Sequence, residues 1–248
     1  MTAVSLKRIL KDANKNKYAV AGLVVLGWDD ALAFTQAADE TGIPIILQAG
    51  PSCRAHTPVP ILGKMFRYLA DQTKTHICCH IDHGYTIREC IEGIDSGFTS
   101  VMFDGSKLSL KENIKITSSI VKKAHNSKVS VEGEVGFVGY ANGKNSKGTL
   151  IDEAIKFSRE SNVDAMAISV GNTHLQTKKI AKIDFDKIQK IQNSISTPLV
   201  LHGGSGIPNQ TRKKLAKETN IAKFNICLLY TSDAADEGLG VDLGGRRI

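Results

Sequence analysis

A regular alternation of short apolar segments with helix-like segments constrains the fold of this 248-residue chain more than any other feature. Eight segments are almost continuously apolar, as expected of strands buried on both faces, and they span residues 18–26, 44–48, 77–82, 100–103, 129–134, 165–170, 199–201 and 222–226. A helix-like segment separates each from the next, which predicts a parallel sheet. Because eight such strands close a barrel, we expect a (β/α)8 TIM barrel. The alternative is a doubly wound open sheet, but no G-x-G-x-x-G follows the first strand.

The segments between the strands have helical spacing of their apolar residues. The predicted helices span residues 29–41, 61–73, 86–96, 110–126, 152–161, 184–195 and 209–219, and a further helix over 4–14, capped by Ser5, precedes the first strand. A Pro-rich loop is expected over 50–60 and a Gly-rich loop over 136–148. No linker divides residues 1–227, which we assign to one domain.

Residues 228–248 depart from this pattern. They read L-L-Y-T-S-D-A-A-D-E-G-L-G-V-D-L-G-G-R-R-I, rich in Gly and Asp and weakly periodic. A barrel needs a helix here to cover the last strand and the first, and the glycines would weaken one. We therefore expect a tail that is not native to the fold, with the last helix incomplete.

Charge and cysteine content narrow the class of protein. The net charge is +7, but no aromatic-rich basic motif accompanies it, so a small anionic substrate or an ordinary solvated surface is favoured over nucleic acid. No apolar run has membrane-spanning length. The five cysteines form no C-x-x-C pair and are odd in number, which argues against a secreted disulfide scaffold. The expected compartment is the reducing cytoplasm.

Three histidines follow predicted strands at equivalent places. His83 follows the third strand in H-I-D-H-G, His174 follows the sixth, and His202 follows the seventh. In a β/α barrel the carboxyl ends of the strands converge on one rim, so these imidazoles can meet. Three protein ligands with one open position are typical of catalytic zinc. Asp82, beside His83, is placed to act as an acid or base.

A glycine-rich turn follows the seventh strand and reads Gly203, Gly204, Ser205, Gly206. Glycines at this place allow backbone N–H groups to face an anion. β/α barrels often bind phosphate in the loops that follow strands seven and eight. Asn225, at the end of strand eight, borders that place. The arrangement favours a phosphorylated substrate.

These residues lie in motifs that resemble those of the class II, metal-dependent ketose-bisphosphate aldolases, in the family's order. The motifs are H-I-D-H-G, S-V-M-F-D-G-S, V-E-G-E-V-G, G-N-T-H, L-V-L-H-G-G-S-G and K-F-N-I. The resemblance covers most of residues 4–226. It implies a (β/α)8 barrel, a Zn²⁺ cofactor and a role in carbohydrate metabolism such as glycolysis. The implied reaction is reversible cleavage of a ketose 1,6-bisphosphate, of fructose or tagatose type, to dihydroxyacetone phosphate and a phosphorylated aldehyde.

The resemblance also implies roles for individual residues. By position, His83, His174 and His202 would bind zinc, and Asp82 would move a proton to and from the C4 hydroxyl. Dihydroxyacetone phosphate would be held by Gly203, Gly204, Ser205 and Asn225. Asp104 and Glu134 resemble acids that orient the ligands or offer a second metal position, although each could equally be a buried hydrogen-bond partner. A homodimer or larger assembly is implied by the resemblance alone.

The chain departs from the family pattern at several points. The family's loop after strand five carries acidic residues, whereas 136–148 has no carboxylate, and Tyr140 is a weak substitute base. Leu175 stands where the family commonly has a glycine. Cys227 and Leu228 replace an expected Thr and acid. Arg54 could supply another phosphate contact or simply be solvated.

The sequence is also compatible with two other functions. One is a zinc hydrolase on the same barrel, with Asp82 activating water, although the first strand contains no histidine. The other is a catalytically impaired paralogue that binds phosphosugars without cleaving them.

Overall fold

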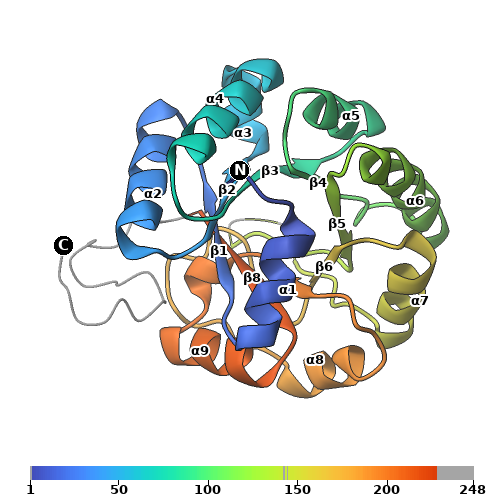
Figure 1. Ribbon diagram of the computed structural model, residues 1–248. Helices are drawn as coiled ribbons and strands as arrows, with labels where there is room; N and C mark the ends of the chain where they lie inside the picture. Colours follow the sequence, from blue (N-terminus) through green and yellow to red (C-terminus); the bar gives the residue numbers. More distant parts are fainter. Residues whose placement is uncertain (1, 142, 144, 228–248) are drawn as a thin grey trace.

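The computed structural model describes residues 2–141, 143 and 145–227, and its centre is a closed barrel of eight parallel strands in sequence order (Figure 1). The strands are β1 (Val20–Val24), β2 (Ile45–Ala49), β3 (Ile77–Gly84), β4 (Ser100–Phe103), β5 (Ser130–Val135), β6 (Ala165–Ile168), β7 (Leu199–Leu201) and β8 (Ile221–Ile226). Pairing of β1 with β8 closes the sheet. The predicted TIM barrel is confirmed, and the open-sheet alternative is wrong.

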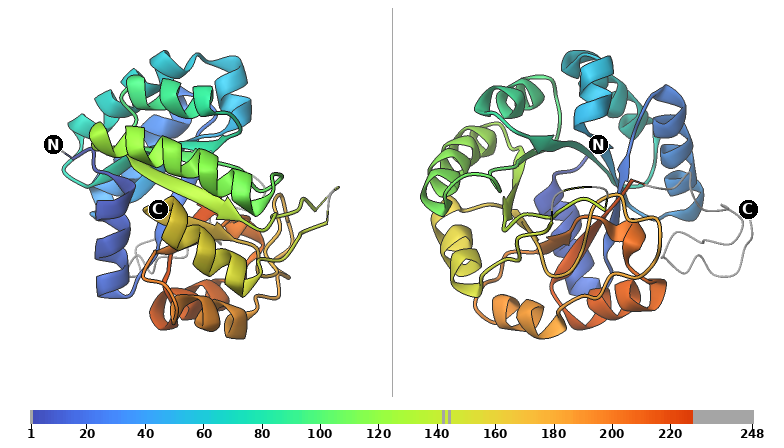
Figure 2. Two further views of the ribbon diagram at one scale, coloured as in Figure 1. Left: turned by 90° about the vertical axis from the view of Figure 1, so that its right-hand side faces the viewer. Right: turned by 180° about the vertical axis from the view of Figure 1, so that it is seen from behind.

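A ring of helices covers the outside of the barrel (Figures 1 and 2). Its members are α2 (Trp28–Thr41), α3 (Pro51–His56), α4 (Val59–Gln72), α5 (Ile87–Asp95), α6 (Leu110–Asn126), α7 (Ile151–Ser161), α8 (Phe185–Gln192) and α9 (Asn209–Glu218). Capping boxes start two of them, with Thr86 and Glu89 at α5 and Ser109 and Glu112 at α6. Their apolar faces pack against the outward-facing side chains of the strands.

The expected loop over 50–60 is wrong. These residues form the short helix α3 and the first turn of α4. The prolines suggested a loop, but Pro51 and Pro60 lie in the first turns of these helices, where no intrahelical N–H bond is lost. This correction matters because α3 carries Arg54 toward the barrel rim.

Helix α1 (Leu6–Asn16) lies across the amino-terminal mouth of the barrel (Figures 1 and 2). The Ser5 side chain accepts a hydrogen bond from the N–H of Arg8, as the predicted cap requires. Leu6, Ile9, Leu10 and Ala13 pack on the lowest layer of the interior, which includes Val20, Ile46, Cys78, Ala165 and Ala222. The loops that follow the strands therefore lie at the opposite mouth.

Charged side chains fill the layer above this apolar plug, where barrels usually hold aliphatic residues. Lys223 Nζ on β8 lies 2.6 Å from Glu132 Oε2 on β5, and both side chains have no exposed surface. Lys223 Nζ also lies 3.3 Å from His80 Nε2, and His80 Nδ1 lies 2.9 Å from Ser100 Oγ. A network of charged and polar groups thus connects β3, β4, β5 and β8 inside the barrel.

The predictions for the tail and for the incomplete last helix lie outside the described residues. Within the described part of the chain, no helix combines the length and the apolarity needed to cross a membrane.

The buried ion pair between Lys223 and Glu132 should contribute to the stability of the fold. Lys223→Met leaves Glu132 as an uncompensated buried anion, and we expect a loss of about 3–5 kcal/mol in the free energy of unfolding. Lys223→Met with Glu132→Gln removes both charges and should recover most of that loss. Urea unfolding measures both, with Lys214→Met in the exposed pair with Glu218 as the control, expected within about 0.5 kcal/mol of wild type. Equal instability of the single and double variants would contradict the role of the pair.

Candidate metal centre

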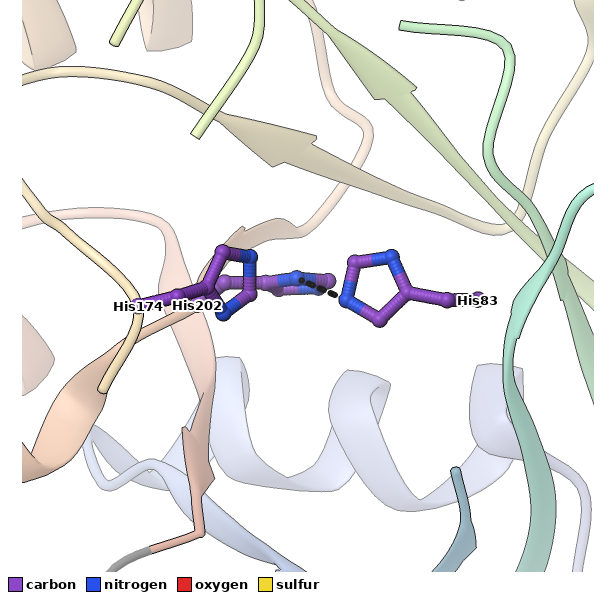
Figure 3. A group of neighbouring side chains, drawn as sticks. All are labelled: His83, His174 and His202. Carbon is purple, nitrogen blue, oxygen red and sulfur yellow. Dashed lines mark hydrogen bonds between the residues drawn. The ribbon is translucent and has the colours of Figure 1, made fainter. Parts of the chain in front are cut away.

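Three imidazole rings meet at the carboxyl-terminal mouth of the barrel (Figure 3). His83 is the penultimate residue of β3, His174 lies in the loop after β6 and His202 directly follows β7. One ring nitrogen from each lies within 4.8 Å of the others, and His83 Nε2 lies 3.1 Å from His202 Nδ1. The structure therefore brings together the three histidines singled out in the sequence. Their function as metal ligands stays a prediction.

A β-bulge at the end of β3 turns two consecutive side chains into this mouth. Ile81 pairs with Val101 and Gly84 pairs with Phe103, so two residues of β3 face one residue of β4. In a regular strand Asp82 and His83 would point to opposite faces. His83 instead adopts a left-handed backbone conformation, with φ of 50°. The bulge is what places the acid beside the imidazole.

Asp104, at the end of β4, orients the His83 ring. Its Oδ2 lies 2.8 Å from His83 Nδ1, which leaves Nε2 directed at the other rings. Ser106 donates to the other carboxylate oxygen through both its N–H and its hydroxyl. Burial opposes protonation of His83, but the carboxylates of Asp82 and Asp104 raise its pKa to about 9. A cation bound at Nε2 would have to displace that proton.

His202 is oriented from below by the charged layer. Its Nε2 lies 3.0 Å from Glu132 Oε1, so Nε2 carries the proton in this network and Nδ1 faces the centre. Asn172 Nδ2 donates to the carbonyl oxygen of His202 at 3.1 Å. Burial lowers the pKa of His202, an effect that the bond to Glu132 partly offsets. The ring is therefore neutral, as a metal ligand must be.

His174 is held by the loop that follows β5. The backbone N–H of His174 donates to the carbonyl oxygen of Gly139 at 2.8 Å, and the backbone carbonyl of His174 accepts from the N–H of Ala141 at 2.9 Å. The Tyr140 ring stacks on His174, with centroids 4.8 Å apart. Burial, helped by the other two histidines, lowers the pKa of His174 to about 3. Burial also raises the pKa of Tyr140, so this phenol supports the ring by stacking rather than as a base.

Two further carboxylates complete the mouth. Asp82 Oδ1 accepts from Asn225 Nδ2 at 3.1 Å, and although burial raises the pKa of Asp82, His83 and His202 lower it overall. Glu134 Oε2 is buried and has no hydrogen-bond partner among the described residues. Burial, reinforced by Asp104, raises the pKa of Glu134 to about 8. Because Glu134 and Asp104 also form a compact group with His83, this orphaned oxygen fits a cation site.

The glycine-rich turn lies next to this centre. Gly203 has φ of 65°, and a Cβ there would lie 2.1 Å from the carbonyl oxygen of Thr173, so only glycine fits. Gly204–Gly206 forms a short 3₁₀ turn, η1. A Cβ on Gly204 would lie 3.0 Å from the carbonyl oxygen of Asn225, and Ser205 hydrogen-bonds Cys227. The four residues predicted to bind substrate therefore lie together, and Asn225 connects them to Asp82.

Leu175, which replaces the family's glycine, has φ of 56°, a conformation that glycine adopts far more easily. The backbone at this place thus keeps a glycine-type geometry although the side chain differs.

Some residues of the site were not found from the sequence. Arg54 was expected at a phosphate or in solvent, but its side chain is 6% exposed and its guanidinium group donates to backbone carbonyls. Glu132 and Lys223 lie inside quoted motifs but were not singled out. Glu132 could have been found, because it shares a strand face with Glu134 two residues later. Asn172 also lies inside a quoted motif, G-N-T-H, but nothing in its spacing distinguished it.

Comparison with known proteins agrees with these observations. The family model described as fructose-bisphosphate aldolase class-II matches residues 4–237. The 6-phospho-5-dehydro-2-deoxy-D-gluconate aldolase of Shouchella clausii is 36% identical, over 94% of this chain and 83% of that protein. The fructose-bisphosphate aldolase of Ureaplasma parvum is 34% identical, over 95% and 84%. The crystal structure of the YdjI aldolase from Escherichia coli K12 superposes with a TM-score of 0.79 at 27% identity, over 91% and 81%.

The Asp104–His83 pair generates a prediction for metal affinity. Asp104→Asn should weaken Zn²⁺ binding by about 10- to 100-fold, because the ring loses the charged partner that orients it. Competition with a chromophoric chelator measures the dissociation constant. Asp164→Asn is the matched control, since Asp164 Oδ2 lies at the same 2.8 Å from His125 Nε2 but directly before β6, at the other end of the barrel. Equal zinc affinity in the two variants would contradict the role of Asp104.

Proposed function

Because the chain belongs to the class II fructose-bisphosphate aldolase family, we propose that it is a zinc-dependent aldolase. The proposed reaction is reversible cleavage of a ketose 1,6-bisphosphate, of fructose or tagatose type, to dihydroxyacetone phosphate and a phosphorylated aldehyde. One observation carries the proposal: three imidazoles converge beside Asp82 and beside a glycine-rich turn in the same mouth of the barrel.

The donor set supports zinc as the cofactor. Three imidazole nitrogens suit a divalent ion of borderline softness, and His83, His174 and His202 would hold it once His83 has lost the proton on Nε2. The unpartnered oxygen of Glu134 lies close to the same rings, 3.9 Å from His202 Nδ1, and would become a negative ligand on loss of its proton. When bound, zinc would act as a Lewis acid toward the oxygens of the substrate.

Asp82 would manage the proton of carbon–carbon cleavage. It is ionised, buried and held by Asn225, so it can accept the proton of the C4 hydroxyl as the C3–C4 bond breaks. The hydroxyl oxygen then becomes the carbonyl oxygen of the aldehyde product, while the electron pair of the C3–C4 bond passes to C3 and the C2 carbonyl oxygen. The resulting enediolate takes up a proton at C3 to give dihydroxyacetone phosphate. In the direction of synthesis Asp82 returns the same proton.

The glycine-rich turn would bind the phosphate of the dihydroxyacetone half. Gly203 and Gly204 allow a close approach of the backbone, Ser205 belongs to the same turn, and the backbone carbonyl of Asn225 lies beside Gly204. Binding at this place would fix the carbon chain relative to Asp82 and the three imidazoles.

Two types of aldehyde half are candidates for the substrate. Relatives of similar identity are named for fructose bisphosphate and for 6-phospho-5-dehydro-2-deoxy-D-gluconate. A panel of fructose 1,6-bisphosphate, tagatose 1,6-bisphosphate and the deoxygluconate phosphate therefore tests the proposal. We expect chelator-sensitive release of triose phosphate or of the corresponding aldehyde. Binding of dihydroxyacetone phosphate without cleavage of any of them would favour the phosphosugar-binding paralogue, which the absence of carboxylates from 136–148 also favours.

A cytoplasmic location belongs to the same proposal and is supported by the five free thiols, of which Cys53, Cys78, Cys79 and Cys90 are buried. Assembly as a homodimer or larger remains a prediction from the family.

Asp82→Asn tests the assignment of the acid. The amide cannot accept the proton, so kcat should fall by about 10²- to 10⁴-fold while zinc content and fold persist. A coupled triose phosphate assay gives kcat, and metal analysis gives zinc content. Asp12→Asn on α1, at the other mouth of the barrel, should leave kcat unchanged. Wild-type kcat in Asp82→Asn would remove Asp82 from the reaction.

A further inference from the structure

Arg54 is an almost fully buried cation at the junction of α3, β2 and β3. Its Nη1 donates to the carbonyl oxygens of Ala49 at 2.5 Å and Asp82 at 2.6 Å. Its Nη2 donates to the carbonyl oxygen of His83 at 2.9 Å and lies 3.4 Å from Glu89 Oε1. Both nitrogens are thus directed at the backbone that carries the candidate acid and the first candidate ligand.

Asp82 and His83 have no register partner on either neighbouring strand, because pairing with β2 ends at Ile81 and pairing with β4 resumes only at Gly84. Asp82 and His83 form the bulge of β3, and Ala49 is the last residue of β2. A bulge disrupts the local ladder, and a buried carbonyl without a donor is costly. The planar guanidinium group carries several N–H donors at fixed angles, so a single side chain can satisfy all three carbonyls. A lysine ammonium in the same place has the charge but not the planar, forked arrangement of N–H donors.

The conformation that Arg54 holds is an unusual one. His83 has φ of 50°, a left-handed conformation that is disfavoured for a residue with a Cβ. Without donors at the Asp82 and His83 carbonyls, the strand could relax toward regular pairing, and that would turn one of the two side chains out of the mouth. The backbone hydrogen bonds therefore decide where the acid and the ring point.

We propose that Arg54 is a positioning residue, which holds the β3 bulge so that Asp82 and His83 face the same centre. For the effect on the reaction, this inference rests on the proposed function. Arg54 acts through the backbone and lies behind the two residues. Glu89 steadies it from α5, where the same carboxylate accepts from the N–H groups of Tyr85 and Thr86.

Arg212 provides a matched comparison in the other half of the rim. Its Nη1 donates to the carbonyl oxygens of Gly204 at 2.7 Å and Ile207 at 3.0 Å, and its Nη2 bonds Asn209 Oδ1. The chemistry is the same as at Arg54, but the backbone that it holds is the glycine-rich turn. Loss of either guanidinium group should destabilise the rim, whereas only Arg54 should affect the three-imidazole centre.

The experiment compares Arg54→Lys with Arg212→Lys, each of which keeps the charge and loses the fork. We expect Arg54→Lys to weaken Zn²⁺ affinity by at least about tenfold in a chelator competition, to change the visible absorption of the Co²⁺-loaded protein and to lower kcat. Arg212→Lys should keep the zinc affinity and the Co²⁺ spectrum of wild type and raise KM for the phosphorylated substrate.

Wild-type zinc affinity and Co²⁺ spectrum in folded Arg54→Lys would overturn the inference, whatever its Tm. Equal losses of zinc affinity in the two variants would also overturn it, because they would indicate general destabilisation. If Arg54→Lys does not fold, Glu89→Gln decides: a weakened zinc affinity supports the inference and an unchanged one overturns it. If wild type cleaves none of the ketose phosphates while Arg54→Lys still loses zinc affinity, the positioning role stands and the proposed function falls.

Discussion

The ion pair between Lys223 and Glu132 supports the candidate centre from inside the barrel. Two charges without exposed surface face each other at 2.6 Å, and neither could stay there ionised without the other. Because Lys223 stabilises the Glu132 carboxylate, that carboxylate can hold His202 Nε2 and direct Nδ1 upward. The orientation of a candidate ligand on β7 thus depends on residues of β5 and β8 in the layer below.

The barrel itself could be predicted because its signals are local. Strand Ser100–Phe103 and helix Leu110–Asn126 have the bounds expected from apolar runs and from the Ser109 cap. The meeting of His83, His174 and His202 followed from topology, since the carboxyl ends of all strands share one rim. The candidate centre could be located from the sequence because each histidine lies at or shortly after the carboxyl end of a recognisable strand.

The parts that could not be predicted depend on pairing between distant segments. The bulge at Asp82 and His83 exists only in relation to β4, so the sequence of β3 alone does not show it. Arg54 has the sequence context of a solvated arginine, and its role depends on which carbonyls the sheet leaves unpaired. Helix α3 was hidden by Pro51 and the neighbouring prolines, which fit a first helical turn as well as a loop.

The charges of the mouth also explain why a divalent cation suits it. Asp82 and Asp104 are buried near one another and keep their charges because His83 lies between them. For Glu134, burial and the neighbouring Asp104 carboxylate outweigh the attraction of His83 and raise its pKa to about 8, so a third carboxylate in the mouth is held in its neutral form. Two neutral rings, His174 and His202, offer lone pairs but no positive charge. A dication among these groups would supply the missing positive charge, bind the neutral nitrogens and give the orphaned Glu134 oxygen a partner.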